Sequence, residues 1–136
     1  MDIDRALEFV RQQPDAVMLT RRRDGSAQMS PIACAVDADR FVVVSTRETA
    51  MKTKNLRRDP RVSLCVVSRG FYGDWIQLDG RAEVISLPDA MERLVEYYRT
   101  LRGDHPDWDD YRAAMERDQR CIVRITPERA GPDRAG

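Results

Sequence analysis

WIQLDGRAEVISL, residues 75–87, alternates apolar and polar residues with a period of two. Successive side chains of a β-strand point to opposite faces, so this period predicts a strand with one buried face. Gly80 lies on the apolar face, and a glycine inside a strand marks a bulge or the close approach of another backbone. The other residues of that face are Ile76, Leu78, Ala82 and Val84.

Further strands are predicted on both sides of this segment, joined by short polar turns. Gly25 in DGS (24–26) favours a hairpin turn, because glycine tolerates the positive φ that such turns need. Pro31 lacks a backbone N–H, so we expect it at a sheet edge or a bulge. Six short strands with tight turns predict an antiparallel barrel. The predicted strands are 16–23, 27–36, 41–47, 61–68, 75–87 and 121–129.

Segments predicted to be helical lie before and between some of these strands. Thr49 is the expected N-cap of the second helix. The last residues, AGPDRAG, are expected to be frayed, which gives one domain over 1–129 and a tail over 130–136. The class is therefore mainly β, or α+β. The predicted helices are 3–12, 48–59, 88–102 and 107–118.

Composition excludes several classes of function. The formal net charge is zero, whereas binding to a nucleic-acid backbone needs a basic surface. Apolar runs are only a few residues long and no secretory leader precedes the first helix, so we expect a cytoplasmic protein without a membrane partner. Cys34, Cys65 and Cys121 lack the spacing of a zinc site or a disulfide framework, and we expect three buried thiols and no metal.

The segment MKTKNLRRDP (51–60) holds the chain's only two lysines, Lys52 and Lys54, although the chain has 23 basic residues. A lysine is a compact point charge that suits a phosphate oxygen, and the start of a helix also favours anions. Ser45, at the end of the preceding strand, completes a candidate phosphate site. The residues alone favour two lysines on a solvent-facing helix, because charge runs on helices usually face solvent, and the phosphate site stays open as the alternative.

Several motifs are similar to those of one known family. The chain resembles the pyridoxamine 5′-phosphate oxidase-like superfamily with the flavin-binding split β-barrel, and within it the deazaflavin (coenzyme F420)-dependent oxidoreductases. The resemblance covers residues 3–126 and implies a six-stranded antiparallel split β-barrel with flanking helices. It also implies a homodimer with cofactor clefts between the two barrels. The motifs are TRRRDGSAQMSPI (20–32), VVVST (42–46), KTKNLRRDPRVSL (52–64), LDGRAEV (78–84) and YRTLRGDHPDWDDYRAAM (98–115).

The resemblance also implies a set of cofactor-binding residues. Ser45 and Lys52 would contact the cofactor phosphate, and Trp75 would approach the site across the dimer. Some relatives carry an arginine two residues before the lysine, where this chain has Ala50, and Arg47 is a candidate substitute. The remaining residues of the implied set are Ser30, Pro31 and Ile32 along the ring, and Thr46, Thr53, Lys54 and Asn55 near the phosphate.

The implied activity is that of an F420H2-dependent oxidoreductase, which passes hydride from the reduced deazaflavin to an electron-poor small organic substrate. No catalytic side chain is assigned, because the cofactor carries the chemistry; Tyr72 is a candidate proton donor. Two alternatives stay open. One is an FMN-dependent flavin reductase or pyridoxamine-phosphate-oxidase-like enzyme, and the other is a non-catalytic protein that binds a cofactor or heme. His105, the only histidine, is expected in a loop or capping role.

Overall fold

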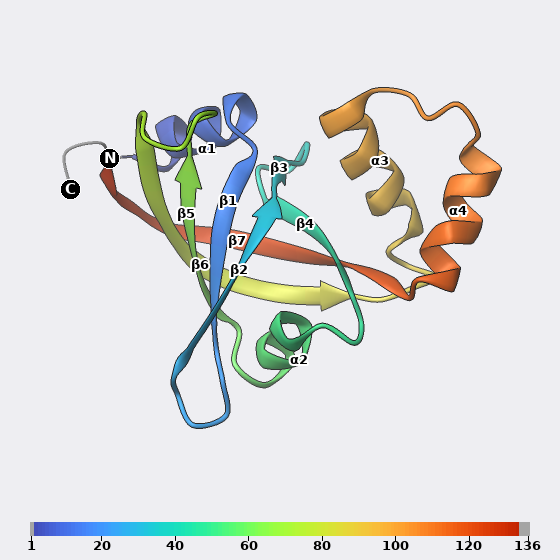
Figure 1. Ribbon diagram of the computed structural model, residues 1–136, viewed down its shortest axis with the longest axis horizontal. Helices are drawn as coiled ribbons and strands as arrows, with labels where there is room; N and C mark the ends of the chain where they lie inside the picture. Colours follow the sequence, from blue (N-terminus) through green and yellow to red (C-terminus); the bar gives the residue numbers. More distant parts are fainter. Residues whose placement is uncertain (1, 134–136) are drawn as a thin grey trace.

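The structure is a computed structural model that describes residues 2–133. Its strands form one sheet in which every neighbouring pair is antiparallel, in the order β2-β1-β5-β6-β7-β4-β3. The sheet curls so that β2, at one end of this order, approaches β4 near the other end (Figure 1). The strands are β1 (Asp15–Arg21), β2 (Ala27–Ala33), β3 (Ala35–Val36), β4 (Val42–Arg47), β5 (Arg61–Val67), β6 (Trp75–Ile85) and β7 (Arg120–Asp133).

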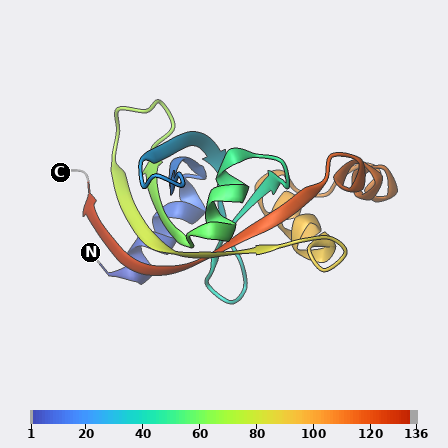
Figure 2. The same cartoon turned by 90° about the horizontal axis from the view of Figure 1, so that it is seen from below.

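Four helices lie around this sheet within the described residues. Figure 2 shows α1 toward one end of the molecule, the α3–α4 pair at the other end, and α2 between them. The predicted class, mainly β with flanking helices, is confirmed. The helices are α1 (Ile3–Gln12), α2 (Met51–Arg58), α3 (Met91–Arg102) and α4 (Trp108–Arg117).

The described part of the chain holds seven strands, not the predicted six, because the segment 27–36 is interrupted at Cys34. The N–H of Cys34 donates to the carbonyl of Pro14 at 2.8 Å, and β3 beyond it pairs with β4. This tertiary hydrogen bond has no local sequence signal. Pro31 does lie on an edge strand, as predicted, and Gly25 takes a positive φ of 88° in the β1–β2 hairpin.

The alternation of 75–87 is confirmed in β6, whose apolar face is buried. A Cβ at Gly80 would lie only 2.2 Å from the carbonyl oxygen of Thr126, so the predicted close backbone approach is confirmed too. The pairing of β6 with β7 continues further than predicted, to Ala130 and Asp133. Residues 130–133 are therefore paired strand and not a frayed tail; the rest of that predicted tail lies outside the described residues.

Two hydrophobic cores lie on either side of β7. The first fills the curled sheet beneath α1 and includes Val123 and Ile125 of β7. The second lies under α3 and α4 and includes Ile122. Its outer part is an aromatic cluster in which the His105 ring packs at a tilt against the rings of Tyr98 and Trp108, and His105 Nδ1 accepts the N–H of Asp107 at 2.9 Å. The expected loop position of this histidine is confirmed.

Burial of the cysteines differs in part from expectation. Cys34 and Cys121 are buried, and burial raises their pKa values to about 12 and about 11. Cys65 is exposed, because the alternation of β5 places it on the outer face of the sheet. Within residues 2–133, no helix combines the length and apolar character needed to cross a membrane. The same residues hold no group of three or more His, Cys, Asp or Glu side chains placed for a metal ion.

Candidate functional site

A cavity of about 450 Å³ lies where β2, β4 and the start of α2 meet. Three segments far apart in the sequence reach it because the curl of the sheet brings β2 close to β4. Five of the ten predicted cofactor-binding residues line it. The residues that line the cavity are Pro31, Ile32, Ala33, Ser45, Thr46, Arg47, Thr49, Ala50, Lys52 and Arg120.

Lys52 is the half-buried cation of this cavity. Its Nζ donates to Ser30 Oγ at 3.4 Å, a long contact, and this places the predicted Ser30 at the same site. Burial lowers the pKa of Lys52, and the positive charge of Arg120 lowers it further. No carboxylate within residues 2–133 forms an ion pair with Lys52. A desolvated cation beside a second cation favours an anion in the cavity.

The start of α2 faces the same cavity without a side-chain cap. Its N-cap is Ala50, whose side chain makes no capping hydrogen bond, so the predicted N-cap at Thr49 is wrong by one residue. Thr49 instead lines the cavity wall. The first N–H groups of a helix lack partners inside the helix and carry a partial positive charge. This end of α2 therefore adds to the positive potential of the cavity.

Thr53 and Thr46 fix α2 against β4 from beneath. Both side chains are buried, and Thr53 Oγ1 donates to the carbonyl of Arg47 at 2.6 Å while lying 3.4 Å from Thr46 Oγ1. Thr53 does not line the cavity, whereas Thr46 does. These hydrogen bonds set the distance between Lys52 on the helix and Ser45 on the strand.

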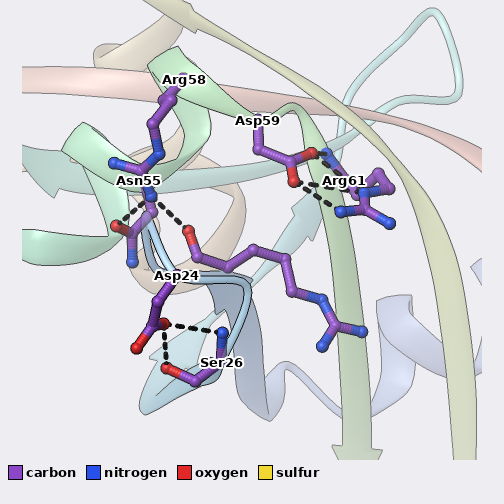
Figure 3. Close-up of polar contacts among 7 residues, drawn as sticks. Asp24, Ser26, Asn55, Arg58, Asp59 and Arg61 are labelled. Atoms are coloured by element: carbon purple, nitrogen blue, oxygen red, sulfur yellow. Dashed lines mark hydrogen bonds and ion pairs between the residues drawn. The ribbon is translucent and has the colours of Figure 1, made fainter.

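Asn55 anchors the other end of α2 (Figure 3). Its Nδ2 donates to Thr20 Oγ1 at 3.1 Å. Its Oδ1 accepts from Arg58 Nη2 at 3.0 Å, the contact drawn in Figure 3. Arg58 also donates to the carbonyl of Arg21 at 2.6 Å, which ties the helix to β1. Asn55 is 1% exposed, so it is satisfied inside the protein and does not reach the cavity.

Two other predicted residues also lie outside the cavity wall. Lys54 is exposed on α2, and Trp75 begins β6, where it pairs with Val67 of β5. A cofactor contact by Lys54, or by Trp75 across a dimer, stays a prediction. The same holds for Thr53 and Asn55, whose hydrogen bonds in this structure are to the protein itself.

A second cavity, of about 590 Å³, shares the wall formed by residues 31–33. Its other walls are mostly apolar and include Val17 and Val67 of the sheet and Phe71 of the following loop. Tyr97 of α3 braces the shared segment, since its hydroxyl donates to the carbonyl of Ala33 at 2.7 Å. The end of β2 thus has a cationic cavity on one side and an apolar cavity on the other.

A polar clamp holds the loop between β4 and α2. Glu48 forms an ion pair with Arg57 at 2.6 Å, and Ser86 Oγ donates to Glu48 at 2.6 Å. Arg57 also donates to Ser86 Oγ at 2.8 Å, which closes the clamp. The hydrogen bond from Arg57 lowers the pKa of Glu48 despite its partial burial. Glu48, which is adjacent in sequence to the cavity residues Arg47 and Thr49, is therefore already paired with Arg57 and Ser86.

Sequence reasoning missed Arg120 and Ala33 as cavity residues. Arg120 immediately precedes the predicted strand 121–129, and only the pairing of β4 with β7 brings it to Ser45 and Lys52. That pairing is long-range, so no local motif could have revealed it. Ala33 could have been inferred from its place beside Pro31 and Ile32 on the same edge strand.

Comparisons with known proteins agree with the fold described above. A family model described as pyridoxamine 5′-phosphate oxidase matches residues 3–132. A conserved hypothetical protein of Mycobacterium tuberculosis superposes with a TM-score of 0.75 and 25% identity over 96% of this chain and 82% of its own. A protein described as an F420 reductase gives a TM-score of 0.68 with 19% identity over 91% of this chain and 94% of its own. The heme storage protein HutZ of Vibrio cholerae gives a TM-score of 0.73 with 13% identity over 98% of this chain and 96% of its own. At 19% and 13% identity, the last two comparisons show a shared fold.

Proposed function

Because the chain belongs to the pyridoxamine 5′-phosphate oxidase family, we propose that it is an oxidoreductase that binds coenzyme F420 and reduces an electron-poor small organic molecule. The family match extends over nearly all of the described residues. The F420 reductase among the structural neighbours has this fold, which supports the choice of cofactor. FMN is the alternative cofactor, and an FMN-dependent flavin reductase or pyridoxamine-phosphate-oxidase-like enzyme is the alternative activity.

The observation that carries the proposal is the position of Lys52. This half-buried ammonium has no carboxylate partner in residues 2–133, yet it lies in a cavity with Ser45 and the uncapped start of α2. These groups offer charge, a hydroxyl and backbone N–H donors, which together suit a phosphate. The site therefore fits the phosphate of a flavin-type cofactor.

The edge of β2 fits the ring of such a cofactor. Residues 31–33 separate the cationic cavity from the apolar one, so a ring that extends from the phosphate would lie along them. An edge strand presents the backbone N–H and C=O groups of alternate residues away from its neighbour, and these can bind polar ring atoms. The bound cofactor supplies the hydride, while the chain's residues orient it and exclude water.

The apolar cavity is the proposed substrate side. Val17, Val67 and Phe71 offer contacts to a flat apolar molecule, and Asp15 is the one ionisable side chain among the described residues that line it. We propose that the cofactor lies in a cleft between two copies of the chain, with Trp75 of each copy facing the partner's site. Light scattering of the purified protein would test the homodimer directly.

The deciding experiment is a paired titration of the purified protein with F420 and with FMN, followed by tryptophan fluorescence and repeated on Lys52→Ala. Tighter binding of F420, weakened at least tenfold by Lys52→Ala, is the expected result. Tighter binding of FMN moves the protein to the flavin alternative. Binding of neither cofactor, or binding indifferent to Lys52, contradicts the proposal.

A non-catalytic role is the second candidate, because a heme storage protein has the same fold over almost the whole chain. Turnover separates the two candidates. The bound, reduced cofactor should be reoxidised faster when electron-poor acceptors such as nitroaromatic compounds or quinones are added. Tight binding without such acceleration would favour the storage role.

A further inference from the structure

The apolar cavity carries one negative charge, that of Asp15, the single ionisable side chain among the described residues that line it. Asp15 is the first residue of β1 and the register partner of Ala33, the last residue of β2. It therefore lies beside the segment 31–33, the wall that this cavity shares with the cationic one. Within residues 2–133 its carboxylate forms no ion pair, so no cation of the described chain balances this charge.

Phe71 brings an aromatic ring to the same cavity. The residue is 60% exposed in the free protein, and its φ of 78° is rare for a bulky side chain. The loop backbone is thus held in a sparsely populated conformation that leaves a large apolar ring uncovered. The face of an aromatic ring attracts cations as well as apolar groups. A carboxylate and an exposed aromatic ring at one cavity suit a flat molecule that carries a positive charge.

The described lining of this cavity offers no side chain that is free to give a proton to a reduced substrate. The hydroxyl of Ser68 donates to the carbonyl of Asp74, and an ionised Asp15 is only an acceptor. The remaining lining residues carry apolar side chains or none, and Tyr72 is not among them. Hydride addition to a neutral quinone or carbonyl leaves an anion, which needs a proton or hydrogen-bond donors. The charge of Asp15 opposes such an anion, whereas hydride addition to a cation leaves a neutral molecule.

We propose that the substrate is a flat organic cation whose positive charge makes it electron-poor, such as an iminium or an N-alkylazinium ion, and that Asp15 is the residue that selects it. The reaction type rests on the proposed function, whereas the sign of the charge follows from the cavity. In the step, a C–H bond forms at the carbon of the C=N⁺ group, the π electron pair moves onto nitrogen, and a neutral amine leaves. The hydride comes from the reduced cofactor, whose oxidation also releases one proton to solvent.

The charges on the other side of the shared wall favour the same choice. Lys52 and Arg120 line the cationic cavity, which is separated from the apolar one by residues 31–33. A cationic substrate is repelled from that cavity, whereas a phosphate is attracted to it. The two cavities therefore sort a cofactor phosphate and a cationic substrate to opposite sides of one edge strand.

The first test measures binding to the whole protein without any cofactor. The probes are N-methylacridinium, a cation that accepts hydride, and acridine, which has nearly the same shape and is uncharged at mildly alkaline pH. By isothermal titration calorimetry, the wild type should bind the cation about threefold to fivefold more tightly than acridine, the effect of one exposed ion pair. Asp15→Asn should abolish this preference.

Three further variants show whether the preference belongs to this cavity. Asp15→Glu keeps the charge and should keep most of the preference. Asp89→Asn removes the same charge from an exposed turn before α3, outside the cavity, and should keep all of it. Phe71→Leu retains an apolar side chain without an aromatic face, so the preference should shrink. Equal affinity of the wild type for the two probes would overturn the proposal, as would an equal loss of preference in Asp89→Asn.

Kinetics with the reduced cofactor distinguish this inference from the proposed function, after subtraction of the reaction of free cofactor. In Asp15→Asn, the KM for N-methylacridinium should rise by the same factor with little change in kcat, because the charge contact exists before the reaction. The KM for a neutral quinone should not rise. Asp15-dependent binding of the cation without its reduction by either cofactor would support the cation site and refute the function. Reduction of neutral acceptors alone, unaffected by Asp15→Asn, would support the function and overturn this inference.

Discussion

The hydroxyl of Tyr97 donates a 2.7 Å hydrogen bond to the carbonyl of Ala33, and so α3 holds the end of the edge strand that separates the two cavities. Burial raises the pKa of Tyr97, which keeps the hydroxyl protonated and available as a donor at neutral pH. An edge strand has a neighbour on one side only, so an outside contact of this kind limits its movement. The helix pair that covers the second core therefore positions a wall of the site.

Replacing Tyr97 with Phe should cost about 1 kcal/mol of unfolding free energy, the usual net value of one hydrogen bond. Because the end of β2 gains freedom, cofactor affinity should fall as well. Urea unfolding and a fluorescence titration check the two effects. Tyr98→Phe is the control, since the Tyr98 hydroxyl makes no hydrogen bond within residues 2–133. Equal effects of the two substitutions would contradict the bracing role.

Replacing Gly80 with Ala should destabilise the protein by at least about 2 kcal/mol. The new Cβ would lie 2.2 Å from the backbone oxygen of Thr126, so β6 and β7 must move apart at the centre of the sheet. Urea unfolding measures this loss. In Gly73→Ala, the new Cβ meets only the side chain of Ser68 in a loop, and the effect should be clearly smaller.

Replacing Asn55 with Ala should cost about 2 kcal/mol, because it removes the buried hydrogen bond to Thr20 and the one accepted from Arg58. Cofactor affinity should stay within about twofold at temperatures where the variant is folded, a change that corresponds to less than about half a kcal/mol. Differential scanning calorimetry followed by titration separates stability from binding. A large loss of affinity in the folded variant would restore Asn55 to the predicted cofactor contacts.

Lys52 should make anion binding weaken at alkaline pH. Its lowered pKa means that the folded protein releases this proton below the ordinary value of 10.5. Anion affinity is full below the lowered pKa and falls as the pH rises through it. Pyrophosphate affinity measured across the alkaline range should show this fall in the wild type and not in Lys52→Arg, because a guanidinium stays charged.

The stability of the free protein should respond to pH with the opposite sign. Between the lowered pKa of Lys52 and 10.5 the unfolded chain binds more protons than the folded one, so this residue makes unfolding free energy rise with pH in that window. Lys52→Met should lack this contribution. Urea unfolding of both proteins over that window gives the comparison; identical slopes would show that Lys52 is not desolvated.

Local patterns were sufficient for most of the fold. The period of 75–87, the helix over 3–12, the turn at Gly25 and the edge position of Pro31 each follow from the φ and hydrogen-bonding needs of nearby residues. The break at Cys34 was missed because its hydrogen bond goes to Pro14, on a different strand. Tertiary partners, not local preferences, set such features.

The candidate site was predictable only where its residues form one motif. Ser45 and Lys52 are close in sequence, and their helix–strand junction brings them together as expected. Arg120 is distant in sequence and arrives through sheet pairing. Asn55 belongs to the motif but turns inward, because a helix sends successive residues to different faces. A sequence motif identifies the helix or strand that carries part of a site. The pairing of strands then decides which distant side chains join it in the same cavity.

The strand β7 makes the molecule a single cooperative unit. Its consecutive residues Ile122 and Val123 face different cores, so neither core can open without breaking the backbone hydrogen bonds that the other also needs. Amide protons of the two residues should exchange with solvent only through global unfolding. Arg120 lies at the first position of this strand. An anion held there would therefore slow hydrogen exchange in the sheet beneath α1 and under the α3–α4 pair alike.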